Sequence, residues 1–401
     1  MLVWAAFMVA ISTPVETSAC PITPPAVNDQ AWRSACDAAI ARATDPRLKA
    51  ELLFRSAYAY NEHDGYFDAV RALQEATRLD PAHALAWHEL SYTENALGNY
   101  TPAEQAADRA IALTPDRAAS YQERGMARHH LGNLEGAYAD RDRIVRMAPD
   151  DAGALLGRAD DALWLGRFDQ AAADLAAAAA HARDDGQRGR IERSRNVLQL
   201  WRTRSGAADP GAACVWPDND AALRPGFIGD CSAAFLAETR PAKRAEYLTF
   251  RSMAWLVAAQ DSEASTGDRK IAVALDPGNA DMHANLGFAY LSARHSWAAS
   301  REFDRALAIR ESWMGLAGRA SAKYNLRDPR GALADARRSF EIQPNELALT
   351  VLGDLSHDRG DTASAKLYWM GAYHLGGRDD GLIERLRSIG VDHPENEPVP
   401  R

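Results

Sequence analysis

Large apolar residues and small residues recur along most of the chain at a spacing that fits pairs of helices. If repeating units begin at residues 50, 84, 118 and 152, large residues fall at positions 4, 7 and 11 of a unit, where they share one helix face. Small residues at positions 8, 20 and 27 would let a second helix pack closely against the first. The residues at positions 4, 20 and 27 of these units are Leu53, Trp87, Tyr121 and Leu155; Ala69, Ala103, Ala137 and Ala171; and Ala76, Ala110, Ile144 and Ala178.

Turn and stop signals lie at fixed places in these units. Leu-Gly pairs at 97–98, 131–132 and 165–166 predict a turn between the two helices, with glycine as a left-handed helix cap. Pro81, Pro115 and Pro149 lie 34 residues apart and end each second helix. The sequence therefore predicts helix–turn–helix repeats of 34 residues.

This pattern resembles the tetratricopeptide repeat, which is a 34-residue helix–turn–helix unit with a proline near its end. The second half of the chain has similar units starting at about residues 246, 280, 313 and 346. Arg124, Arg158 and Arg319 depart from the pattern, because they replace the usual apolar residue at position 7. The resemblance implies an all-α fold, an α-solenoid of helix–turn–helix repeats.

A longer period divides the chain into two modules of about four repeats each. Phe54-Arg55-Ser56 matches Phe250-Arg251-Ser252 at an offset of 196 residues, and Asp80-Pro81 matches Asp276-Pro277 at the same offset. Each module would close with a capping helix that covers the apolar face of its last repeat. The expected organisation is a signal peptide at 1–19, module 1 at 20–204, a linker at 205–210, module 2 at 211–392 and a disordered tail at 393–401.

The four cysteines follow the same duplication. Cys20 and Cys36 open the first module, and Cys214 and Cys231 open the second at offsets of 194 and 195. Four cysteines allow three pairings, and the duplication favours one local disulfide in each module. Disulfides persist in oxidising compartments, whereas four buried free thiols are the alternative.

The start of the chain favours export. An apolar stretch at 2–11 precedes a proline and then small residues before Cys20, as in a secretory signal. A buried N-terminal helix is the alternative. We expect a periplasmic or secreted bacterial protein without a transmembrane segment in its mature form, or one that is lipid-anchored through Cys20.

Charge and motifs argue against several function classes. The net charge of −9 disfavours a nucleic-acid binder, which needs clustered cations. The cysteine spacing does not suit zinc, and the adjacent His129 and His130 point about 100° apart on a helix. Phosphate-binding loops and the common hydrolase motifs are missing from the sequence. We therefore expect no enzyme activity, no metal site and no cofactor.

The resemblance also implies where a partner would bind. Positions 2, 5, 9 and 12 of each first helix line the inner groove of tetratricopeptide arrays. Here this face carries aromatic, amide and histidine side chains that suit an extended peptide. The expected peptide-binding residues are Phe54, Tyr58, Asn61, His88, Tyr92, Asn95, Gln122, Met126, His129, Phe250, Phe288 and Tyr324. The expected function is a scaffold that binds a protein or peptide, and the alternative is a structural component of the cell envelope that acts by self-association.

Overall fold

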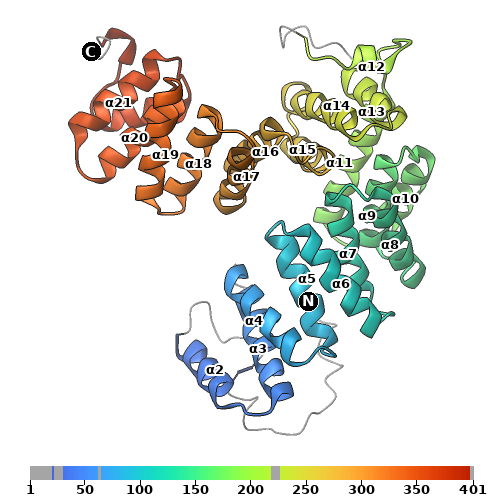
Figure 1. Ribbon diagram of the computed structural model, residues 1–401. Coiled ribbons are helices and arrows are strands. Elements are labelled where there is room, and N and C mark those ends of the chain that lie inside the picture. Colours follow the sequence, from blue (N-terminus) through green and yellow to red (C-terminus); the bar gives the residue numbers. More distant parts are fainter. Residues whose placement is uncertain (1–19, 22–29, 62–64, 218–225, 398–401) are drawn as a thin grey trace. The chain divides into compact units, whose positions relative to one another are not determined.

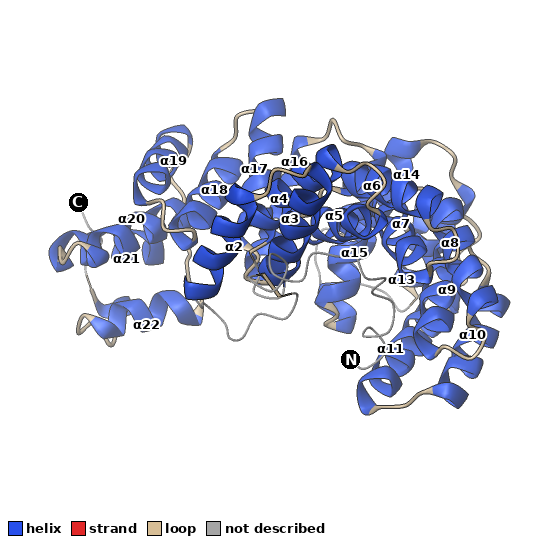
Figure 2. Cartoon of the chain, turned by 90° about the horizontal axis from the view of Figure 1, so that it is seen from below, coloured by secondary structure: helices blue, strands red, loops and turns tan. Residues whose placement is uncertain are grey.

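The computed structural model describes residues 20–21, 30–61, 65–217 and 226–397. Its contacts divide the chain into unit 1, Met1–Leu198, and unit 2, Gln199–Arg401. In the described part of the chain every regular element is a helix (Figure 2). The predicted signal peptide at 1–19 lies outside the described residues.

Unit 1 consists of helical pairs in chain order (Figure 1). In each pair the first helix packs against the second, and first helices of neighbouring pairs also contact one another. The helices are α2 (Gln30–Arg42), α3 (Pro46–Asn61), α4 (Tyr66–Leu79), α5 (Ala84–Ala96), α6 (Tyr100–Leu113), α7 (Ala118–His130), α8 (Leu134–Met147), α9 (Ala152–Trp164), α10 (Phe168–His181) and α11 (Asp185–Arg202). The four pairs α3–α4, α5–α6, α7–α8 and α9–α10 correspond to the four repeats predicted for the first module.

Unit 2 repeats this plan with one irregular turn. Its pairs are α14–α15, α16–α17, α18–α19 and α20–α21, and a five-residue π-helix, η3 (Trp255–Ala259), replaces the short turn of the first pair. The helices are α12 (Pro210–Ala213), α13 (Phe227–Ala237), α14 (Pro241–Ala254), α15 (Ser262–Leu275), α16 (Ala280–Ser292), α17 (Ser296–Ile309), α18 (Trp313–Asn325), α19 (Pro329–Ile342), α20 (Glu346–Asp358), α21 (Thr362–His374), α22 (Asp380–Ser388) and the 3-10 turn η4 (Pro394–Asn396).

The small residues of the repeat pattern lie where two helices approach most closely. The alanines at position 20, Ala69, Ala103, Ala137 and Ala171, are all 0% exposed. A larger side chain there would push the paired helices apart, because protein interiors are packed without spare volume. The short residues thus set the spacing within each pair.

The turns of unit 1 have glycine at the left-handed position, as predicted. Two turns of unit 2 have arginine there instead. Gly98, Gly132 and Gly166 have φ angles of 71°, 76° and 70°. Arg294 and Arg327 adopt similar angles of 61° and 63° in unit 2. Left-handed backbone costs a residue with a side chain about 1 kcal/mol, which the packing of the flanking helices outweighs.

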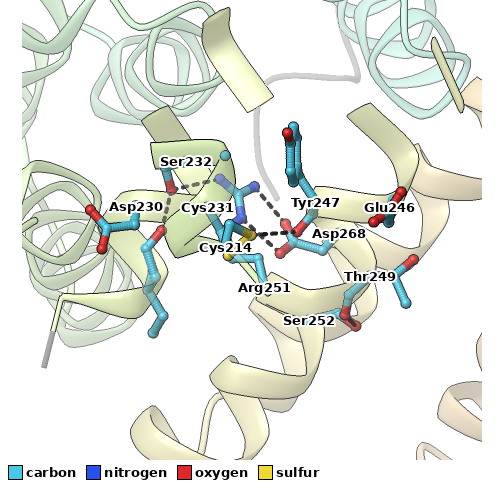
Figure 3. Close-up of a disulfide and its surroundings, with 12 residues drawn as sticks. Cys214, Asp230, Cys231, Ser232, Glu246, Tyr247, Thr249, Arg251, Ser252 and Asp268 are labelled. Atoms are coloured by element: carbon cyan, nitrogen blue, oxygen red, sulfur yellow. Dashed lines mark hydrogen bonds and ion pairs between the residues drawn. A yellow bond between two sulfur atoms is a disulfide. The ribbon is translucent and has the colours of Figure 1, made fainter. Parts of the chain in front are cut away.

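Both leading segments are held by disulfides. Cys20 is bonded to Cys36 in α2, and Cys214 is bonded to Cys231 in α13 (Figure 3). All four cysteines are 0% exposed, and the Sγ atom of Cys20 lies 3.9 Å from the carbonyl oxygen of Leu52 on α3. A lipid attached to the Sγ atom of Cys20 would exclude this bridge, because that atom forms only one such bond.

Each of the three position-7 arginines is half-buried and forms ion pairs with one buried aspartate and one more exposed aspartate. Each arginine binds an aspartate at position 23 of its own second helix through two nitrogens, and an aspartate of the preceding second helix through Nη1. The pairs are Arg124 with Asp140 and Asp108, Arg158 with Asp174 and Asp142, and Arg319 with Asp335 and Asp304, at 2.6–3.0 Å. We call each of these triads a rung.

The ends of the modules differ from their predicted limits in one respect. The segment 203–209 between α11 and α12 is not helical, and it includes all of the expected linker except Pro210, which begins α12. The predicted disordered tail is wrong for its first residues, since Pro394 is buried in η4 and Glu397 pairs with Lys366 at 3.0 Å. Among the described residues, no helix has the length and apolar character needed to cross a membrane.

Candidate functional site

The structure places the twelve predicted peptide-binding residues in three kinds of environment. Four are buried, namely Phe54, Asn61, His88 and Asn95. Six are half-buried, namely Tyr58, Met126, His129, Phe250, Phe288 and Tyr324. Tyr92 and Gln122 are exposed.

Side chains at position 12 link successive first helices. Asn61 donates from Nδ2 to Thr93 Oγ1 at 2.8 Å. Asn95 donates from Nδ2 to the backbone and side-chain oxygens of Glu123, at 2.9 and 3.0 Å. These bonds cross from one repeat to the next, so Asn61 and Asn95 stabilise the stacking of repeats instead of offering free amides to a peptide.

His88 is buried without such a link. It is 6% exposed, and its Nδ1 atom has no hydrogen-bond partner among the described residues. Burial, and secondarily the nearby charge of Arg117, lower the pKa of His88 to about 4. The ring is therefore neutral at pH 7.

Four accessible predicted residues of unit 1 lie on two consecutive first helices, α5 and α7. Tyr92 on α5 is 39% exposed, Gln122 on α7 is exposed, and Met126 and His129 lie further along α7. His129 contacts Trp164 of α9 edge to face, with 5.5 Å between ring centroids. We call the surface formed by these five residues the first-helix face of unit 1.

Carboxylates lie beneath this face, and no sequence motif marks them as a site. Asp161 Oδ1 lies 2.7 Å from His129 Nδ1, and Asp160 accepts a hydrogen bond from Ser194 Oγ of α11 at 2.8 Å. Burial, together with the like charge of Asp161, raises the pKa of Asp160 to about 6. Burial also raises the pKa of Glu123.

One arginine reaches this group of acids from the opposite side of the repeat. Arg141 on α8 brings Nε to 3.7 Å from Asp161 Oδ2. A Cβ atom on Gly157 would lie 3.2 Å from the Arg141 side chain, so glycine there leaves room for it to pass. Three carboxylates, those of Glu123, Asp160 and Asp161, thus face one permanent cation, and this excess negative charge lies next to the aromatic face.

The predicted residues of unit 2 are used largely in packing. Phe288 lies edge-on to Phe303 with ring centroids 5.0 Å apart. Tyr324 donates its hydroxyl to Asp358 at 2.9 Å, again joining successive first helices. Phe250 is half-buried on α14. The aromatic, amide and histidine surface of the accessible predicted residues is therefore concentrated in unit 1.

The arrangement offers contact area and hydrogen bonds but no assembled nucleophile. Ser194 bonds to Asp160 and not to His129, so the histidine is not placed to take its proton. Within the described ranges, no three histidine, cysteine or acidic side chains are grouped so that they could hold a metal ion.

The positions of the small residues, the turns and the paired helices identify the type of repeat. Four pairs in each unit pack first helix to second helix, with position-20 alanines at every contact in unit 1. The chain is a solenoid of tetratricopeptide-like repeats.

Comparisons with known proteins give structural neighbours but no family assignment. No protein-family model and no curated protein matches the chain. The crystal structure of MamA is similar at 22% identity over 37% of this chain and 90% of that one, with a TM-score of 0.34. A tetratricopeptide repeat protein from Parabacteroides merdae is 14% identical over 85% of this chain and 98% of that one, with a TM-score of 0.30. YrrB, a tetratricopeptide repeat protein with an unusual peptide-binding site, is 14% identical over 70% of this chain and 96% of that one, with a TM-score of 0.34.

Proposed function

We propose that this tetratricopeptide-like chain is a non-catalytic scaffold that binds an extended segment of another protein on the first-helix face of unit 1. The observation that carries the proposal is the exposure of Tyr92 and Gln122 on neighbouring first helices, beside the half-buried Met126 and His129. Aromatic rings supply contact area at little entropic cost, and the amide of Gln122 suits a peptide backbone.

The charge beneath the face supports a basic partner. Glu123 and Asp161 are 6% and 4% exposed, and Asp160 lies beside them. Because burial makes carboxylates costly to ionise, a cation at the surface above them would be attracted and would lower their pKa values. We therefore expect the bound segment to carry lysine or arginine.

A peptide selected against the protein tests this proposal. The full chain, with its disulfides intact, would be used to select binders from a random peptide library, and fluorescence anisotropy would measure Kd for the best one. We expect Tyr92→Ala with Gln122→Ala to weaken binding at least tenfold. The matched control is Phe67→Ala on the second helix α4, where a ring is 49% exposed, and it should leave Kd unchanged.

Two results would contradict the proposal. Equal binding by the double variant and the wild type would place the site elsewhere. A mass that rises with protein concentration in light scattering, and is unaffected by Tyr92→Ala, would favour the self-association role instead.

We further propose that the protein works in an oxidising compartment, which agrees with a periplasmic or secreted location. The support is that both units have a fully buried disulfide at the same place. Protein isolated from its native host should show no thiol labelling before reduction and a mass that starts at Cys20. Four labelled thiols on a longer chain would contradict this location.

A further inference from the structure

The rungs show which side chains fill the space beside position 7 in the repeats that carry arginine there. In each rung the arginine lies between its own second helix and the second helix of the preceding repeat. Arg158, for example, is bonded to Asp174 of α10 and to Asp142 of α8. The same space therefore accommodates a whole arginine side chain when the flanking residues are short acids.

The repeat formed by α5 and α6 has no rung, because it keeps the usual apolar residue at position 7. Position 7 is Leu90, position 23 is Ala106, and the preceding second helix contributes Gln74. A cavity of about 430 Å³ lies there, between α4, α5 and α6. Its wall is completed by Trp87, Glu94, Pro102, Gln105, Asp108 and Arg109.

The floor of this cavity is apolar except for one buried acid. Leu90 and Ala106 are 7% and 2% exposed, and Glu94 is 4% exposed. Glu94 Oε2 accepts a hydrogen bond from Asn99 Nδ2 at 2.6 Å. Among the described residues, no arginine, lysine or histidine forms an ion pair with Glu94, although buried carboxylates are normally paired.

The rim is open and contains an aromatic ring. Gln74, Gln105 and Arg109 are exposed, so a side chain can enter from solvent. Trp87 donates its indole Nε1–H to the carbonyl oxygen of Pro81 at 3.0 Å, which fixes the orientation of the ring. Asp108, also on the rim, is already paired with an arginine of the next rung.

We propose that this cavity receives the side chain of an arginine from a partner polypeptide, in the place that a position-7 arginine takes in a rung. Glu94 supplies the counter-charge, Trp87 supplies an aromatic surface, and Gln74 and Gln105 supply amide oxygens for the remaining N–H groups. The positive charge of Arg109 on the rim repels a bound cation, but Arg109 is exposed and solvent screens its charge. The site is separate from the first-helix face and does not depend on the function proposed for it.

A blocked amino acid tests the site without a known partner. N-acetyl-arginine N-methylamide would be titrated into the full chain, and N-acetyl-citrulline N-methylamide would serve as the neutral isostere. The readout is the indole N–H resonance of Trp87, which Trp87→Phe would assign. We expect the resonance to move on arginine binding, and citrulline to bind at least tenfold more weakly.

Three variants sharpen the test. Glu94→Gln should weaken arginine binding at least tenfold, while Asp116→Asn, which removes an exposed carboxylate outside the cavity, should not. Leu90→Arg with Ala106→Asp should build the rung from within the chain and abolish binding. Equal shifts by arginine and citrulline, or unchanged arginine binding in Glu94→Gln, would overturn the proposal.

Arginine binding in the cavity can be measured separately from peptide binding on the first-helix face. Tyr92→Ala should bind the blocked arginine as the wild type does, because Tyr92 does not line the cavity. If the variant with Leu90→Arg and Ala106→Asp does not fold, the comparison of Glu94→Gln with Asp116→Asn still shows whether Glu94 binds the arginine.

Discussion

The fully buried ion pair between Arg251 and Asp268 gives the sharpest test of what holds unit 2 together. Both residues are at most 1% exposed. Arg251 donates from Nε and Nη2 to Asp268 at 2.8 and 2.7 Å, and from Nη1 to Ser232 Oγ at 2.8 Å (Figure 3). Its guanidinium carbon also lies 3.9 Å from the ring centroid of Trp201. The cluster thus joins α13, α14, α15 and the last turn of α11.

Removing the acid should be costly, because it leaves a charge with no counter-charge in the interior. Asp268→Ala takes away two of the three guanidinium bonds and also the acceptor of the Trp255 indole N–H, which lies 3.1 Å from Asp268. Breaking a buried pair in this way costs about 3–5 kcal/mol. We expect a value near the upper end, since the indole N–H also loses its partner.

The control is an ion pair of the same unit at the surface. Glu311 and Arg338 lie 3.0 Å apart with side chains 53% and 50% exposed. Such pairs contribute about 0–1 kcal/mol, so Glu311→Ala should change stability little. Arg251→Met with Asp268→Leu should recover most of the loss, because an apolar pair removes both charges together and Ser232 keeps its bond to the carbonyl of Ile228.

Hydrogen exchange on the full oxidised chain, followed by mass spectrometry, measures the effect locally. A loss of about 4 kcal/mol corresponds to roughly a thousandfold faster exchange through opening in α14 and α15. Peptides from α5 to α8 serve as the internal reference. If Asp268→Ala costs no more stability than Glu311→Ala, or if the double variant is as unstable as Asp268→Ala, the Arg251–Asp268 pair does not stabilise unit 2 in this way.

Three further outcomes follow from the same structure. The pKa of Asp160 is raised to about 6, above its unfolded value near 3.9, so the folded state binds the proton more tightly and stability falls as pH rises from about 4 through 6. Asp160→Asn should therefore gain up to about 2–3 kcal/mol at pH 7.5 and flatten urea-unfolding stability over this range; an unchanged pH profile would contradict this. Replacing Cys214 and Cys231 by serine should cost about 3 kcal/mol in the same assay, because the bridge closes a loop of 17 residues, and a cost below 1 kcal/mol would argue against it. Arg124→Ala should cost about 2 kcal/mol more than Arg167→Ala, because the first breaks a rung with the buried Asp140 and the second breaks an exposed pair, and calorimetric Tm values of the two variants should differ accordingly.

The repeat architecture was predictable because it depends on local sequence. Helix, turn and stop signals recur every 34 residues, and the close contact within a pair needs only small residues such as Ala69 and Ala103 at the right positions. The duplication also indicated the pairing of Cys20 with Cys36 and of Cys214 with Cys231, since each copy must be held by its own cysteines. The π-helix was not anticipated, because an extra residue in a turn leaves no periodic signal.

The sequence by itself therefore determined the helices, their pairing and the places where the chain departs from the repeat. The tertiary structure determined which contacts the side chains at these places make. Asn61 and Asn95 are used between repeats because a neighbouring first helix brings a partner within 3 Å, and that partner lies 28 to 32 residues away in the chain. The cavity above Glu94 lies between three helices, and a volume that separate segments leave between them has no signature in the sequence of any one of them.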